Sequence, residues 1–351
     1  MKKILIPVLL IASTLFIFNA CKKKNDAAVM GKNINYPAVY VVNGGSSTIS
    51  VINLNTNNVS DSIGLLNPPA MNIWPHHIYH HQSSTMHHLA VGVPGMDLSA
   101  GHTGGMPGMT GAFLILDAEK GVITKEVTLP MMNHNATYSP DGSEIWTTQM
   151  DIDGRVLVYD ANTYAVKSNL TVGEEPAEVT FSADGTKAYV CNGASNTVTV
   201  IDPASKNILS TINVGTNPVG AWPSTIGKMF VDCEDGQTIE VIDVASDTKV
   251  VTIDLGFMPG YAAYNPTTSE LWVSNPMDGK VSWYMDMGSN TWMQHGEFTT
   301  GAGAHAIIFY NGYGYVTNQE ANTVSLVNAS NHSKVKDIPV GDKPNGITIK
   351  N

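Results

Sequence analysis

Short apolar runs, each followed by a polar turn, recur along almost the whole chain from residue 38 onward. The clearest example is Tyr315-Val316-Thr317-Asn318, which a second alternating run at 323–327 follows. A period of two residues within such short runs indicates antiparallel β-strands. Equivalent phrases begin at Tyr40, Tyr189, Phe230 and Trp272. A unit that repeats without helical spacing between its copies predicts a β-propeller or a solenoid.

The spacing of the repeated unit gives the number of blades. The first strand of the unit has seven starts: Pro75, Asn133, Pro176, Pro218, Pro259, Ala304 and Pro344. Apart from the first, the intervals between starts are 40 to 45 residues, an ordinary length for a four-stranded blade. The pattern therefore predicts an all-β fold, a seven-bladed β-propeller of four-stranded blades over residues 37–351.

The two ends of this region are expected to build one blade together. The start at Pro344 leaves room for a single strand, whereas residues 38–66 hold three strands and no inner one. Sharing a blade closes the ring by strand pairing and leaves no exposed edge at the junction.

One repeat is nearly complete. Pro176-Ala177 leads to the turn Ser182-Ala183-Asp184-Gly185 and then to Tyr189-Val190-Cys191-Asn192. This order resembles the YVTN-repeat family of β-propellers, and the likeness covers nearly all of the chain after its first 36 residues. The resemblance implies the same propeller architecture as the spacing does.

The N-terminus has the features of an export signal. Lys2 and Lys3 precede an apolar run that ends at Phe18, too short to span a membrane, and Asn19-Ala20-Cys21 follows. A small residue before this Cys resembles a lipobox, although Phe18 departs from the usual Leu. We expect residues 1–20 to be a lipoprotein signal peptide and Cys21 to carry lipid.

Residues 21–36 then form a flexible tether, and the protein is extracytoplasmic, anchored to a bacterial membrane, the outer membrane by preference. The alternative is an ordinary signal peptide with an incidental Cys. The formal charge of −11 argues against a nucleic-acid partner, because such binding needs clustered Lys and Arg. We expect a monomer in which Cys191 and Cys233 are buried free thiols.

The interval from Pro75 to Asn133 is 58 residues, longer than the others. The excess is a Gly- and Pro-rich loop at 93–111, placed between the second and third strands of its blade, on the face where the inner strands begin. Its notable side chains are one His and three Met: His102, Met96, Met106 and Met109. Imidazole and thioether groups are ligands that suit copper.

The residue after each strand start occupies the same place beside the central channel. His76, His134 and His305 hold three of these seven positions. Three imidazoles at one repeat phase, under a His/Met loop, predict a metal site at the top of the channel. The alternative is a wet channel lined by three polar residues. In a regular strand the side chain of His77 points the other way, so it is left out of this group.

A second group of histidines lies on the hairpin at the opposite end of the channel: His80, His81, His87 and His88. Cross-strand neighbours such as His80 and His87 would form a secondary metal cluster. A polar, partly exposed hairpin is the preferred interpretation of this group.

Nucleophile elbows, phosphate loops and dinucleotide fingerprints are absent from the sequence, so an enzyme is the less favoured interpretation. We expect a membrane-tethered binding or scaffold propeller that holds a metal ion, copper by preference, with a protein or small molecule as a further ligand of its top face. The alternative is a copper-dependent redox enzyme. The adjacent His76-His77 pair weakly resembles the copper-binding propeller of nitrous oxide reductase, but three axial histidines are too few for that ligand set.

Overall fold

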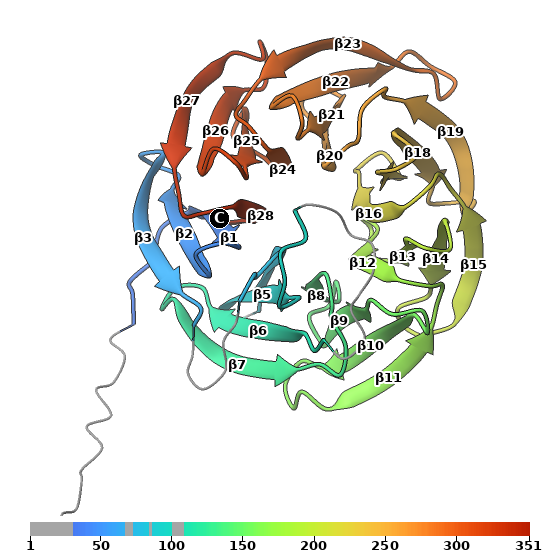
Figure 1. Ribbon diagram of the computed structural model, residues 1–351, viewed down its shortest axis with the longest axis horizontal. Coiled ribbons are helices and arrows are strands. Elements are labelled where there is room, and N and C mark those ends of the chain that lie inside the picture. The colour runs from blue at the N-terminus through green and yellow to red at the C-terminus, as the bar shows by residue number, and fades with distance from the viewer. Residues whose placement is uncertain (1–30, 67–72, 84–85, 100–108) are drawn as a thin grey trace, which may run out of the picture. The chain divides into compact units, whose positions relative to one another are not determined.

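The computed structural model describes residues 31–66, 73–83, 86–99 and 109–351. The chain divides into two units, and the described part belongs to the second, residues 31–351. Its strands form seven separate four-stranded antiparallel sheets around one axis (Figure 1). No helix occurs among the described residues, and therefore none of sufficient length and apolar character to cross a membrane is found there. The fold predicted from the repeats, an all-β seven-bladed propeller, is confirmed.

The blades are numbered here from the one that contains the N-terminal strands. Blade 1 consists of β28 (Pro344–Lys350), β1 (Ala38–Asn43), β2 (Thr48–Asn53) and β3 (Asn58–Gly64). Blade 2 consists of β4 (Ile78–Gln82), β5 (His87–Val93), β6 (Ala112–Asp117) and β7 (Val122–Thr128). Blade 3 consists of β8 (Ala136–Tyr138), β9 (Glu144–Gln149), β10 (Arg155–Asp160) and β11 (Val166–Thr171). Blade 4 consists of β12 (Pro176–Phe181), β13 (Ala188–Asn192), β14 (Thr197–Ile201) and β15 (Ile208–Asn213).

The remaining three blades follow the same order. Blade 5 consists of β16 (Pro218–Pro223), β17 (Lys228–Cys233), β18 (Thr238–Asp243) and β19 (Thr248–Asp254). Blade 6 consists of β20 (Tyr261–Asn265), β21 (Glu270–Asn275), β22 (Lys280–Asp286) and β23 (Trp292–Thr299). Blade 7 consists of β24 (Ala304–Tyr310), β25 (Tyr313–Asn318), β26 (Thr323–Asn328) and β27 (Lys334–Pro339).

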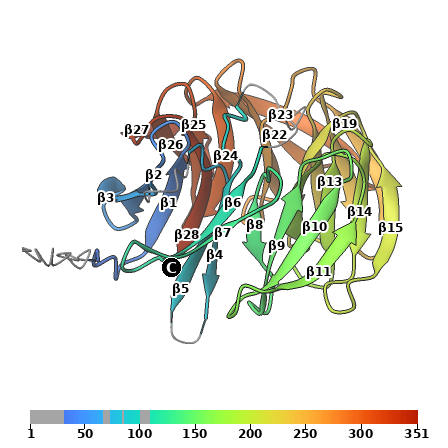
Figure 2. The same ribbon diagram turned by 60° about the horizontal axis from the view of Figure 1, so that its bottom comes forward.

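The ring closes through the shared blade, as the sequence predicts. Strand β28 pairs antiparallel with β1, so the C-terminal strand is the inner strand of a blade whose other three strands are N-terminal. It also contacts β24 on one side and β4 on the other, which joins the last blade to the second (Figures 1 and 2). This pairing leaves no open sheet edge at the junction of the ends.

Two residues of the repeated phrase explain why it recurs. The Tyr of the phrase is buried and its hydroxyl group bonds to a neighbouring blade: Tyr40 donates to the carbonyl of Ala118, and Tyr315 to Asn57. The Asn of the phrase holds the turn between the second and third strands. The amide of Asn318, for example, donates to Thr323 and Ser325 at 3.0 and 2.9 Å. One residue therefore fixes a turn within the blade, and the other fixes the packing between blades.

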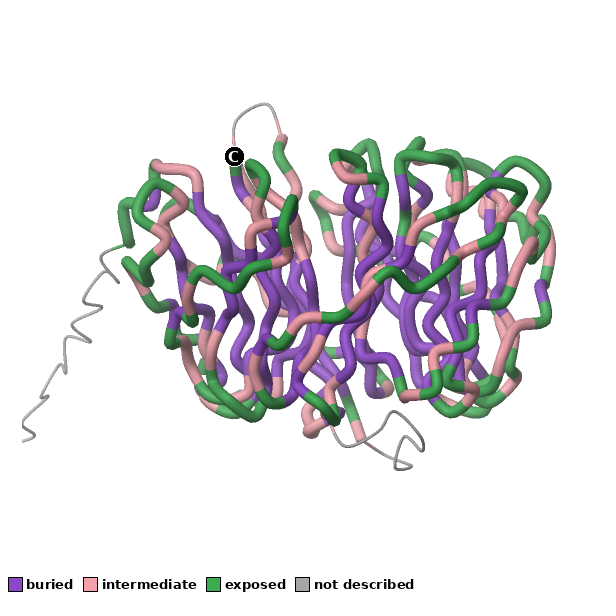
Figure 3. The backbone as a smooth tube through the Cα atoms, turned by 90° about the horizontal axis from the view of Figure 1, so that it is seen from above, coloured by how far each residue is buried: buried purple, intermediate pink, exposed green. Residues whose placement is uncertain are grey.

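Buried residues form the middle strands of each blade, whereas exposed residues concentrate in the loops at both ends of the ring and on the outermost strands (Figure 3). Both Cys191 and Cys233 are buried free thiols within one such core, as expected. The packed domain begins before residue 37, where the sequence analysis placed its boundary. The amide of Ile34 donates to the carbonyl of Glu119, and the Ile34 side chain is fully buried.

Candidate metal centre

A backbone irregularity places two consecutive residues at the channel in each blade where the inner strand begins. In blade 2 the amide of His76 donates to the carbonyl of Gly92, and the amide of Gly92 donates to the carbonyl of His77, at 2.9 and 3.0 Å. Two residues thus oppose one, which is a β-bulge. Register shifts occur at the same place in blades 1, 4, 5 and 7.

The bulge corrects one prediction. A regular strand would turn the His77 side chain away from His76, and the sequence analysis excluded His77 for that reason. Regular pairing in this blade begins only at Ile78, so the alternation of side chains does not extend to His76 and His77. Both rings lie at the channel, with their centroids 4.6 Å apart.

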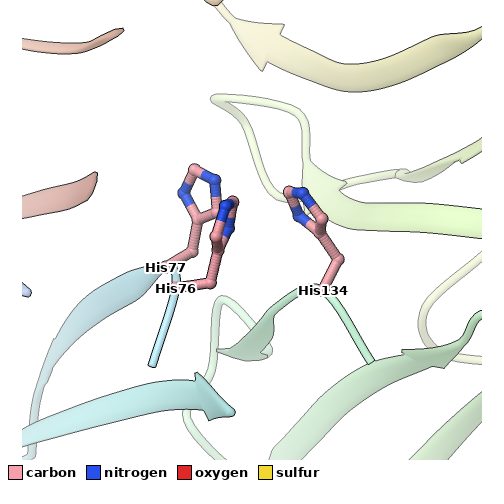
Figure 4. A group of neighbouring side chains, drawn as sticks. All are labelled: His76, His77 and His134. Atoms are coloured by element: carbon pink, nitrogen blue, oxygen red, sulfur yellow. The ribbon is translucent and has the colours of Figure 1, made fainter. Parts of the chain in front are cut away.

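Three histidines meet at the axis. Ring nitrogens of His76, His77 and His134 lie within 4.8 Å of one another, and all three side chains are buried. The His76 and His134 centroids are 4.3 Å apart, and those of His77 and His134 are 5.0 Å apart. Figure 4 shows the rings projecting into one space, two from the segment ahead of β4 and one from the segment ahead of β8. Among the described residues this is the one group of His, Cys, Asp or Glu that meets the geometry of a metal site.

A buried carboxylate holds two of the three rings. Nε2 of His77 and Nδ1 of His134 each lie 3.0 Å from Oε1 of Glu178, whose side chain has no solvent exposure. The hydroxyl of Tyr79 donates to Oε2 of the same carboxylate at 3.1 Å. Burial by itself raises the pKa of Glu178, but the electrostatic effect of the His77 ring beside it and the hydrogen bonds from His134 and His77 outweigh it. The pKa of Glu178 therefore lies well below its ordinary value, and this residue remains a carboxylate.

Glu178 was not among the predicted site residues, although a signal for it exists. It follows Ala177 in the inner strand of blade 4, so it occupies the same second bulge position as His77 does in blade 2. Comparing this second position around the ring, rather than the first alone, would have found it.

Two glycines allow the neighbouring backbones to approach the histidines. A Cβ atom on Gly346 would lie 2.7 Å from the Cα of His77, and one on Gly92 would lie 2.7 Å from the carbonyl oxygen of His134. These separations are too short for any side chain, and the amide of Gly346 donates to the carbonyl of His76 at 2.9 Å. The bulged segments are thus held between adjacent inner strands without intervening side chains.

His305, the third predicted axial histidine, borders the group. Its ring centroid lies 6.2 Å from that of His76 and 6.0 Å from that of His77, and the side chain is buried. It is therefore a neighbour of the three closer rings, and it faces them from blade 7.

The described start of the 93–111 loop covers the top of this group. Met96 packs against a buried cluster of Leu98, Met132 and Met150. Together with His76, Met96 lines a cavity of about 10 Å³. Lys343, which also lines this cavity, lies 3.3 Å from Asp97 and ties the loop to the neighbouring blade 1. Met109 is half-buried, whereas His102, Met106 and the predicted lipidation site Cys21 lie outside the described residues.

The hairpin histidines lie on β4 and β5, further from the bulge along the strands. His81 is paired with His88 across the strands, and Nε2 of His80 lies 2.9 Å from Nδ1 of His87. Burial and the charges of neighbouring histidines and Lys350 lower the pKa of His80 to about 4. These four residues do not appear among the groups whose ligand atoms converge in the described part of the chain.

The fold and this centre define the chain as a seven-bladed β-propeller with a histidine-lined channel. No protein-family model matches it, and no curated protein matches it. Solved structures share the fold. A functionally unknown protein from Desulfotomaculum acetoxidans has a TM-score of 0.70 at 14% identity, covering 89% of this chain and 98% of that one. The periplasmic gluconolactonase of Pseudomonas aeruginosa has a TM-score of 0.68 at 16% identity, covering 90% and 99%.

A putative 6-phosphogluconolactonase from Bacteroides fragilis is similar to the same degree, with a TM-score of 0.68 at 15% identity, covering 91% of this chain and 99% of that one. These likenesses extend over nearly the whole chain in each case. At such low identity they establish the propeller fold and carry no assignment of activity.

Proposed function

We propose that this protein is an exported propeller that binds a transition-metal ion, copper by preference, at the top of its channel. The observation that carries the proposal is the buried meeting of His76, His77 and His134, of which the last two bond to the carboxylate of Glu178. Metal-binding histidines characteristically donate their second ring nitrogen to a carboxylate, which fixes the tautomer and the ring orientation.

The donor set fits a metal ion. Donation from Nε2 of His77 and Nδ1 of His134 to Glu178 leaves Nδ1 of His77 and Nε2 of His134 as the nitrogens that carry a lone pair. A tetrahedral ion with bonds of about 2.0–2.1 Å needs ligand atoms roughly 3.4 Å apart. One ligand atom from each of the three residues lies within 4.8 Å of the others, and ring rotations that shorten these separations would complete the site. His305 supplies a further imidazole at the border of the group.

Copper is favoured over zinc because of the sulfur atoms nearby. Met96 lines a cavity together with His76 and packs against the cluster that includes Met132 and Met150. Thioethers bind Cu(I) well and are poor ligands for harder ions. The bound ion would supply Lewis-acid or redox chemistry, while the chain's own residues hold it, orient the imidazoles and keep water out.

A second candidate function is a copper-dependent redox enzyme. It is favoured by the adjacent His76-His77 pair, of which both rings face the channel. Turnover of nitrous oxide by the reduced, copper-loaded protein would distinguish this enzyme from a binding protein.

Titration with Cu(I) and Cu(II) against a competing chelator tests the binding proposal. We expect one ion per chain and a loss of affinity of at least about 100-fold when His76, His77 and His134 are all replaced by Ala. Replacing His80, His81, His87 and His88 by Gln is the matched control, which should leave this affinity unchanged. Loss of binding in the hairpin variant alone would show that copper binds at the hairpin histidines and not at the axial ones. A wild-type protein that binds no copper would also refute the proposal.

The export and the anchor are part of the same proposal, and they rest on the sequence of residues 1–36 and its resemblance to lipoprotein signals. Replacement of Cys21 by Ser should abolish acylation and leave unprocessed or released protein. Fractionation with detergent, together with mass spectrometry of the N-terminal peptide, measures this. A Cys21→Ser variant that is still shortened and acylated would contradict the lipid anchor.

A further inference from the structure

A second cavity opens at the other end of the channel. It has a volume of about 300 Å³, and aromatic rings from five consecutive blades line it: Tyr79, Tyr138, Phe181, Trp222 and Tyr261. Tyr79 lies two residues beyond His77 along the chain, a displacement of about 7 Å in an extended strand. The cavity therefore begins on the far side of the histidine group, and the proposed metal site does not include it.

One layer of rings separates this cavity from the histidines. The Trp222 and Tyr261 centroids are 3.7 Å apart, and they lie 6.1 and 6.4 Å from the centroid of His77. Tyr79 completes the layer, with its hydroxyl donating to Glu178. These rings have one side toward the metal centre and the other toward the open cavity.

The position of Trp222 is fixed by its neighbours. Its indole lies over Gly220, where a Cβ atom would be 2.2 Å from the ring. Nε1 of Trp222 donates to Oδ1 of Asp232 at 2.7 Å, and the amide of Gly220 donates to the same oxygen at 3.0 Å. Burial raises the pKa of Asp232 well above its ordinary value, which disfavours the charged form of this carboxyl group behind the wall.

The lining excludes several classes of ligand. It contains no charged side chain among the described residues, so an anion such as a phosphorylated sugar would find no counter-charge. Its two threonine hydroxyls are already engaged, because Thr180 donates to the carbonyl of Ala221 and Thr137 to that of Tyr138. A free sugar would find side-chain hydroxyl partners mainly on the tyrosines of the lining, and each of its buried hydroxyl groups without a partner would cost about 1–3 kcal/mol.

We propose that this cavity binds a small, uncharged, planar aromatic molecule that stacks on the Trp222–Tyr261 wall. Aromatic rings prefer offset-stacked or edge-to-face contacts with other rings, and five such rings converge here. The volume lies at the lower end of the range for ligand cavities, about 300–1,000 Å³, which suits one or two fused rings. The inference does not depend on a metal ion at the other end.

Binding of three probes to the full chain tests the ligand class. 2-Naphthol is neutral and planar, naphthalene-2-sulfonate has the same rings with a negative charge, and glucose is neutral and polyhydroxylated. By calorimetric titration we expect saturable binding of 2-naphthol, binding of the sulfonate weaker by about tenfold or more, and no measurable binding of glucose. Equal affinity for the sulfonate, or no saturable binding of 2-naphthol, would overturn the proposal.

Variants locate the site. Trp222→Leu removes half of the stacking wall and should weaken 2-naphthol binding about tenfold or more. Trp283→Leu, on β22 and outside the cavity, is the matched control and should bind as the wild type does. Phe181→Ala is a second cavity variant at a half-buried position, in case Trp222→Leu fails to fold, and it should weaken binding several-fold.

The triple replacement of His76, His77 and His134 by Ala should abolish copper binding and leave 2-naphthol binding intact, which separates the two proposals. Unchanged 2-naphthol affinity in the folded cavity variants would show that the probe binds elsewhere, and the inference would be wrong.

Discussion

Two groups of histidines lie on the first part of the chain, and they differ in what holds them. In the axial group, His76, His77 and His134, the last two bond to the single carboxylate of Glu178. The hairpin group, His80, His81, His87 and His88, is more crowded in the sequence, yet its members contact one another and an aromatic ring. Nε2 of His80 lies 2.9 Å from Nδ1 of His87, and His81 stacks on Tyr138 at 4.8 Å.

The comparison shows that a high density of histidines does not by itself make a metal site. A carboxylate that accepts from two rings fixes their tautomers and orientations and balances the charge of an ion. Imidazoles that bond to one another consume the nitrogens that would bind the ion. Neutral pairs of this kind make the folded state sensitive to acid. Each ring disfavours protonation of its neighbour, which lowers the pKa in the folded chain relative to the unfolded one.

The largest effect should follow removal of β28, the inner strand that bonds to the segment carrying His76. Deleting residues 344–351 removes β28, whose Gly346 amide donates to the carbonyl of His76. A blade without its inner strand cannot bury its face, so we expect the melting temperature to fall by more than about 10 °C. Differential scanning calorimetry measures this, with deletion of the exposed Asn351 alone as the control. An unchanged melting temperature would contradict the role of β28 in closing the ring.

A smaller and more selective effect should come from the carboxylate itself. Glu178→Gln keeps the shape of the side chain but removes its negative charge and replaces the oxygen that accepts from Tyr79 by an NH2 group, so copper affinity should fall by about 10–100-fold. Asp232→Asn is the matched control, because this buried carboxyl group accepts from Trp222 and Gly220 rather than from histidine. Competition titrations compare the two variants. Equal losses, or no loss in either, would remove the distinction between the two groups of histidines.

The smallest effect concerns acid stability of the hairpin group. The pKa of His80 is lowered from 6.5 to about 4, so the unfolded chain binds more protons than the folded one between these values. Stability must then rise with pH, and the contribution that is complete above about pH 6.5 is lost as the pH falls toward 4. His80→Gln should reduce the difference in unfolding free energy between pH 7 and pH 5 by roughly 1 kcal/mol, after allowance for the partial exposure of the ring.

Urea unfolding at the two pH values measures this difference, and His295→Gln on β23 is the control.

The axial group contributes to stability over a different pH range. Because the pKa of Glu178 is lowered, its contribution is present above the ordinary Glu value of about 4.3 and is lost only as the pH falls below it. A His80→Gln variant with the same pH dependence as the wild type would show that the hairpin pair does not titrate as its contacts indicate.

The sequence by itself determined the architecture, because a propeller is built from local repeats. The clearest copies of the phrase carry a turn-forming Asn and an interblade Tyr, so the blade can be recognised from a few residues and its weaker copies can be counted. The shared blade followed from the same counting, since the start at Pro344 left no room for three more strands. Repeat phase also identified His76, His134 and His305 as residues of one channel.

Only the tertiary structure decided which of these residues meet. The bulge opposite Gly92 turned His77 toward the axis, and it arises from backbone pairing between strands, which no periodicity of side chains records. Glu178 reached the group from blade 4, 44 residues from His134, because inner strands of neighbouring blades converge at the axis. Contacts within a blade are local in sequence and can be read from it, whereas contacts across the channel depend on how all seven blades pack around it.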